Sequence, residues 1–153
     1  MTSYIPEGWG TMSPYLVMKN AAAAIDFYVA AFDAEILSRM NMPDGGVGHA
    51  ELQIGNSKFM LADEFPDQGY LGPESIGGTP VSFMLYVQNV DAVFARAVAA
   101  GATALRPVED QFYGDRVGSV KDPAGHIWSI ATHIEDVPSD EIDRRFREMM
   151  SGQ

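Results

Sequence analysis

Residues 14–28 read PYLVMKNAAAAIDFY, and this stretch defines the first βα unit of the chain. Its beginning, around Leu16, is a short apolar run rich in residues that favour strands. Asn20 stands where an N-cap residue would begin a helix. Apolar residues then recur at the 3.6-residue spacing of a buried helical stripe. The stretch therefore predicts a strand over residues 13–19 followed directly by a helix over residues 21–32.

Three further strands are predicted after this helix. Residues 35–42 and 48–54 are typical of strands, and a Gly55-Asn56 turn leads into a fourth strand over residues 57–63. Residues 48–54 alternate between apolar and polar side chains, so the polar set faces away from the helix. That set consists of His49, Glu51 and Gln53.

The same order of elements recurs in the second half. Aligning Leu16 with Leu85 also aligns the two cap residues, Asn20 and Asn89. Strands are predicted over 81–87, 104–108, 115–121 and 126–132, with a helix from Val90 to the stop at Gly101. An acid-to-base run from Ser139 to Met150 predicts a final surface helix. We therefore expect one domain over residues 1–137, with module one at about 12–65, a linker at 66–80, module two at about 81–134, and a helix and tail at 138–153.

Composition narrows the possible partners. The net charge is −11 and the chain has no Cys, which excludes thiol nucleophiles and Cys-bound metal sites. The acidic balance disfavours nucleic acid and anionic membranes, and it favours a cationic ligand. No apolar run approaches the length of a membrane span, and the first residues have no signal-peptide pattern. We therefore expect a soluble cytoplasmic protein.

Three stretches carry a family resemblance: PYLVMKNAAAAIDFY at 14–28, HAELQIGNSKFMLADEFP at 49–66 and LRPVEDQFYGDRVGSVKDPAGHIWSIATHIEDV at 105–137. With the duplicated βαβββ unit, they resemble the vicinal oxygen chelate superfamily, which includes glyoxalase I, bleomycin-resistance proteins and extradiol dioxygenases, and within it the PhnB-like branch. The resemblance implies an α+β fold in which the two modules form a curled eight-stranded sheet around a cleft. It places the helices on the convex face, and it implies a homodimer.

The resemblance also implies where a divalent metal would be held on the concave face. By register, the four ligand positions fall at Ser13, Met60, Ser82 and Ser129. Neutral hydroxyls and a thioether are poor ligands for a catalytic divalent ion, which prefers imidazole and carboxylate. We therefore expect no metal site and no other cofactor, and a metal-dependent protein is the less favoured alternative.

Several side chains are candidates for a site in the cleft. His49 and Glu51 would act as an acid/base pair, or they are polar residues on a solvated sheet face. Arg116 would bind a ligand carboxylate, or it ties Asp110 or Asp115 to hold a loop. An acidic rim at Asp63, Glu64 and Asp67 would attract a cation, or it is a solvated charged loop. The candidate ligand-binding residues are Tyr15, Gln53, Met60, Ser82, Met84, Tyr86, Arg116 and Ser129.

Three functions remain open. The favoured one is a glyoxalase/bleomycin-resistance-like protein that binds a small molecule without the usual catalytic metal. The second is a glyoxalase-like isomerase, lyase or dioxygenase acting on a small oxygen-rich substrate, either with a metal or with His49 and Glu51 as acid and base. The third is a structural homodimer whose cleft is filled by its own side chains.

Overall fold

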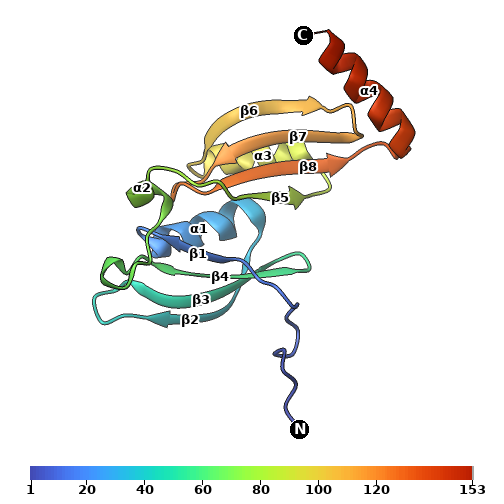
Figure 1. The fold of residues 1–153 in the computed structure, drawn as a ribbon. Coiled ribbons are helices and arrows are strands. Elements are labelled where there is room, and N and C mark those ends of the chain that lie inside the picture. The colour runs from blue at the N-terminus through green and yellow to red at the C-terminus, as the bar shows by residue number, and fades with distance from the viewer. Residues whose placement is uncertain (153) are drawn as a thin grey trace.

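Each half of the chain folds as a strand, a helix and three strands in the computed structural model, which describes residues 1–152 (Figure 1). Module one comprises β1 (Tyr15–Met18), α1 (Ala21–Phe32), β2 (Glu35–Asn41), β3 (Val47–Ile54) and β4 (Ser57–Asp63). Module two comprises β5 (Ser82–Tyr86), α3 (Val90–Ala99), β6 (Thr103–Asp110), β7 (Asp115–Lys121) and β8 (Ile127–His133). The linker forms the 3-10 helix η1 (Pro66–Gln68) and the short helix α2 (Pro73–Ile76), and α4 (Ser139–Ser151) ends the chain.

The strands form two four-stranded sheets, with the orders β1-β4-β3-β2 and β5-β8-β7-β6. In each sheet the first strand pairs in parallel with the last strand of its module, and the other pairings are antiparallel. The α+β class and the two βαβββ modules are thus confirmed. The structure differs in one respect from the expected single sheet of eight strands, because among residues 1–152 no strand of one module pairs with a strand of the other.

The helices explain why the sheets remain separate. In Figure 1, α1 lies between the two sheets, and it packs against α3 as well as against β3 and β4. Tyr28 and Phe32 of α1 reach Trp128 of β8, with ring centroids 5.4 Å and 4.9 Å away. Each sheet therefore buries one face in a shared core, and we call the opposite face of each sheet its outer face.

Local sequence signals account for the start of α1 and α3, the helices of the two modules. The side chains of Asn20 and Asn89 accept hydrogen bonds from the backbone N–H groups of Ala23 and Ala92, so both predicted caps are confirmed. No helix among residues 1–152 combines the length and apolar character needed to cross a membrane.

Candidate functional site

Tyr15, His49 and Glu51 meet on the outer face of module one. Tyr15 lies on β1 and the other two lie on β3, while Met60 of β4 pairs with both Tyr15 and Glu51. The alternation of β3 explains the arrangement, because Ala50 is fully buried under the helix while its neighbours point outward. The sequence-based orientation of His49 and Glu51 is thus confirmed, although their chemical role stays a prediction.

The three side chains form a short polar chain. The Tyr15 hydroxyl lies 2.9 Å from His49 Nδ1, and His49 Nε2 lies 3.8 Å from Glu51 Oε1. Because the carboxylate favours an N–H at Nε2, we assign Nδ1 as the acceptor and the Tyr15 hydroxyl as its donor. Burial, with smaller contributions from Tyr70 and Glu51, raises the pKa of Tyr15, so its proton stays on the phenol at neutral pH.

A hollow of about 670 Å³ lies next to this polar chain. Its aromatic walls are Tyr15, Phe65 and Tyr70, and the last two are held by reciprocal backbone hydrogen bonds across η1. Three carboxylates also line the hollow, and its lining contains no Lys or Arg. The remaining lining residues are small, apolar or neutral: Val17, Met42, Gly46, Val47, Gly48, Ala62 and Gln68, beside the acids Asp44, Asp63 and Glu64.

Two of these acids also organise the backbone. Asp63 accepts from the N–H groups of Ala21 and Val47 at 2.7 and 2.6 Å. Glu64 accepts from the Gly72 N–H and the Ser75 hydroxyl, and these bonds lower the pKa of Glu64. These carboxylates therefore do more than form a solvated rim: Asp63 holds the starts of α1 and β3 together, and Glu64 fixes the linker beside the hollow and stays ionised there.

The module-two candidates lie on a different sheet. Met84 of β5 pairs with Ser129 of β8, and Met84 is half exposed on the outer face of module two. Ser82 and Tyr86 have the same orientation on β5. The structure therefore brings Tyr15, His49, Glu51 and Met60 together, but it does not bring them together with Ser82, Met84, Tyr86 and Ser129.

A second polar cluster was not proposed from the sequence. The Tyr86 hydroxyl donates to Oδ2 of the buried Asp115 at 2.7 Å, and His133 Nδ1 lies 2.7 Å from Oδ1. His133 Nε2 lies 2.6 Å from Asp136. The alternation of side chains along β7 and β8 could have indicated this cluster. Asp115 and His133 lie opposite each other on these two strands, so their side chains are on the same face of the sheet.

Arg116 and Gln53 are committed to other contacts. The Arg116 guanidinium bonds both carboxylate oxygens of Asp91 at 2.9 Å and Asp110 at 3.0 Å. Of the two roles considered for Arg116, the structure favours the loop tie, with Asp110 rather than Asp115 as one partner. Gln53 turns back to donate to the Gly55 carbonyl of its own hairpin, so it does not extend over the hollow.

The donor chemistry does not fit a catalytic divalent metal. Met60 lies on one sheet, and Ser82 and Ser129 lie on the other. Across residues 1–152, no three His, Cys, Asp or Glu side chains are grouped so that they could hold a metal ion. The hydroxyls and thioether at the expected positions are weak donors for such an ion, so no chemical step is assigned to a metal.

Comparison with known proteins places this geometry in context. A model of the Glyoxalase/Bleomycin resistance protein/Dioxygenase superfamily matches residues 11–130. The chain is 49% identical over 134 residues to the uncharacterised protein Mb0911c of Mycobacterium bovis. The aligned region covers 86% of this chain and 88% of that protein.

Solved structures agree with the fold. The Arabidopsis thaliana gene product At5g48480 superposes with a TM-score of 0.66 and 26% identity, over 80% of this chain and 98% of that one. The PhnB protein of Bacillus cereus superposes with a TM-score of 0.65, over 80% of this chain and 99% of that one. The two sequences are 21% identical, so the comparison shows a shared fold only.

Proposed function

Because the chain belongs to the Glyoxalase/Bleomycin resistance protein/Dioxygenase superfamily, we propose that it is a small-molecule binding protein that works without the superfamily's catalytic metal, and that its ligand is an aromatic cation. The hollow of module one carries this proposal. Three aromatic rings and three carboxylates line one space, with no basic side chain among the lining residues.

This lining matches the chemistry of an aromatic cation. The faces of Tyr15, Phe65 and Tyr70 attract positive charge through their ring quadrupoles, and a flat ligand can stack on them. The Tyr15 proton is used in the bond to His49, so the phenol oxygen offers lone pairs to a ligand N–H. Glu51 and the lining carboxylates add negative potential, which the chain's net charge of −11 reinforces.

A calorimetric titration with benzyltrimethylammonium tests this proposal, with neutral benzyl alcohol as the matched probe. The cation should give saturable heat that benzyl alcohol does not reproduce. Because a desolvated cation–π contact contributes up to about 2 kcal/mol, Tyr70→Ala should weaken binding by about tenfold. Tyr4→Ala is the control, since Tyr4 is 93% exposed and lies outside the hollow. Equal affinity in wild type and Tyr70→Ala would contradict the proposal.

The enzymatic alternative rests on the chain from Tyr15 through His49 to Glu51. With its Nε2–H directed at Glu51, His49 would take up a proton from an acidic C–H group at Nδ1, after the Tyr15 hydroxyl has turned away from that nitrogen, and this is the step that a metal-free isomerase would need. Assays with the hemithioacetal of methylglyoxal and glutathione distinguish the two functions. The binding proposal expects no turnover, whereas turnover that is lost in His49→Ala would establish the enzyme. Elemental analysis that finds a divalent metal at one per chain would replace both proposals.

We also propose that two copies of the chain form a homodimer through their outer faces. Large apolar side chains are exposed there on both sheets, with Met40 at 58%, Met84 at 49% and Tyr86 at 59% exposure. Contact between copies would remove such surface from water. Light scattering coupled to size-exclusion chromatography should give twice the chain mass, and Met84→Asp should shift the protein toward the monomer mass. A monomeric wild-type protein would refute this.

A further inference from the structure

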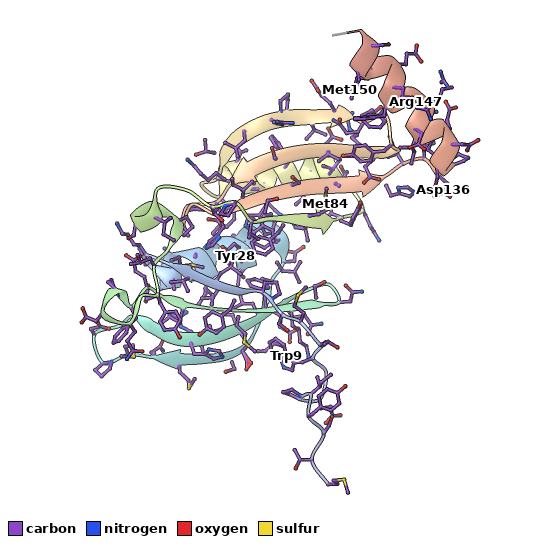
Figure 2. All side chains as sticks on the ribbon, viewed as in Figure 1. Trp9, Tyr28, Met84, Asp136, Arg147 and Met150 are labelled. Atoms are coloured by element: carbon purple, nitrogen blue, oxygen red, sulfur yellow. The ribbon has the colours of Figure 1, made fainter. Side chains whose placement is uncertain are left out.

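A second cavity, of about 470 Å³, lies at the seam between the modules. The N-terminal segment forms one wall through Gly8, Gly10 and Ser13, while the start of β4 and the edge strand β5 form the others. Figure 2 shows Trp9 on this segment beside the sheet of module one, and Met84 on β5. We call this space the seam pocket, and it shares no charged residue with the hollow of module one.

Lys58 gives the seam pocket its charge. Of the residues in its lining, all within the described part of the chain, Lys58 is the only charged one. Its ammonium lies 5.5 Å from the ring centroid of Trp9, and no carboxylate in residues 1–152 lies within ion-pair distance. The pocket is thus locally positive on an otherwise acidic protein.

The rest of the lining completes a receptor for an acid. The hydroxyls of Ser13 and Ser82 and the amide NH2 of Asn56 are neutral donors, which suit carboxylate oxygens, while the Ser57 hydroxyl donates to Asn56 Oδ1. Phe83 and Leu85 present apolar surface on which a ring can lie. We propose that the seam pocket binds a small aromatic carboxylate, with the carboxylate on Lys58 and the hydroxyls of Ser13 and Ser82 and the ring against β5.

The two tryptophans make the test direct. The chain contains two Trp residues: Trp9 lies beside the Lys58 ammonium, and Trp128 lines the pocket. In the full-length Trp9→Phe variant, Trp128 is the sole fluorophore of its type, and Phe keeps a ring beside Lys58. Titration with benzoate should change the fluorescence saturably. Benzyl alcohol, which lacks the charge, should not, and added salt should weaken benzoate binding.

Substitution of Lys58 decides the proposal. Because a charge-assisted hydrogen bond is lost, Lys58→Gln should weaken benzoate binding by about tenfold or more, while Lys58→Arg should retain most of the affinity. Lys121→Gln is the matched control, since Lys121 ends β7 outside the pocket and should bind like wild type. Thermal unfolding of each variant confirms that it is folded.

Two results would overturn the seam-pocket proposal. Absence of saturable binding by both fluorescence and calorimetry would overturn the proposal, as would unchanged affinity in folded Lys58→Gln. The test is also independent of the function proposed for module one. Tyr70→Ala, which should weaken binding of the cation, should leave benzoate affinity unchanged, because Tyr70 lies in the hollow and not in the seam pocket.

Discussion

The phenol of Tyr28 donates a 2.5 Å hydrogen bond to Oδ2 of Asp122, which lies 94 positions later in the chain. Tyr28 belongs to α1 of module one, and Asp122 begins the turn between β7 and β8 of module two. The same buried carboxylate accepts from Trp128 Nε1 at 2.9 Å and from the backbone N–H groups of Ala124 and His126. One buried acid therefore fastens the two modules together.

Removing the Tyr28 hydroxyl should destabilise the protein. Tyr28→Phe keeps the ring in the aromatic core but leaves a buried carboxylate with one donor fewer, at a cost of about 1–3 kcal/mol. Urea denaturation measures this change in the free energy of unfolding. Tyr4→Phe, at an exposed position, should leave it unchanged. Equal stability of Tyr28→Phe and wild type would mean that this bond does not help to hold the modules together.

The second polar cluster predicts a pH dependence. Hydrogen bonds to Asp115 first, and to Asp136 second, raise the pKa of His133 above the ordinary histidine value of about 6.5. The folded state therefore holds this proton more tightly than the unfolded chain does. The stabilisation is fully present below pH about 6.5 and is lost as the pH rises through the folded-state pKa.

Two measurements check this dependence. NMR titration should show the His133 ring changing charge above the ordinary histidine value. The melting temperature of wild type should fall over that pH window relative to His133→Asn, which has no titrating ring. A His133 transition at or below the ordinary value would show that the two carboxylates do not favour the charged ring.

Gly114 lies against residues 134–137, the segment that leads from β8 into α4. It has a φ of +104°, and a Cβ placed there would collide with the Glu135 carbonyl oxygen. Gly45 provides a matched control, because its φ is +90° and a Cβ there meets nothing within 4 Å. Gly45→Ala should cost about 1 kcal/mol from backbone strain alone. Gly114→Ala should cost at least about 2 kcal/mol. Chemical denaturation compares the two, and equal losses would show that the collision is relieved.

Arg116 should contribute to stability rather than to binding. Its side chain is 34% exposed and its partners Asp91 and Asp110 are 58% and 65% exposed, so the network is screened by solvent. Arg116→Lys, which cannot bond Asp91 through two nitrogens of a planar fork, should lower the unfolding free energy only slightly, because solvent screens the network. Titration with benzyltrimethylammonium should give the wild-type affinity. A large loss of affinity would instead restore Arg116 as a ligand-binding residue.

Local patterns in the sequence were sufficient to predict the helices and strands, and to predict which way His49 and Glu51 point. Cap residues such as Asn20, together with apolar periodicity, predicted the helix of each module and all eight strands to within a few residues. Alternation in β3 predicted that His49 and Glu51 share an outward face. These features depend on neighbours along the chain, and sequence periodicity records them directly.

Long-range arrangements were not predictable in the same way. Whether the two sheets join depends on how α1 fills the space between them, and no local pattern encodes that packing. The aromatic walls at Phe65 and Tyr70 lie at the start of the linker, for which no helix was predicted, although Pro66 and Pro73 stand at the first positions of its short helices. The seam pocket depends on the N-terminal segment meeting β4 and β5, which are far from each other in sequence.

The position of α1 between the two sheets has a consequence for how such a duplicated protein diversifies. The two outer faces belong to different sheets and share no strand. A substitution on one of them can therefore leave the strands of the other sheet in place, so selection, or a protein engineer, can change the side chains of one half of this scaffold while the interior stays the same.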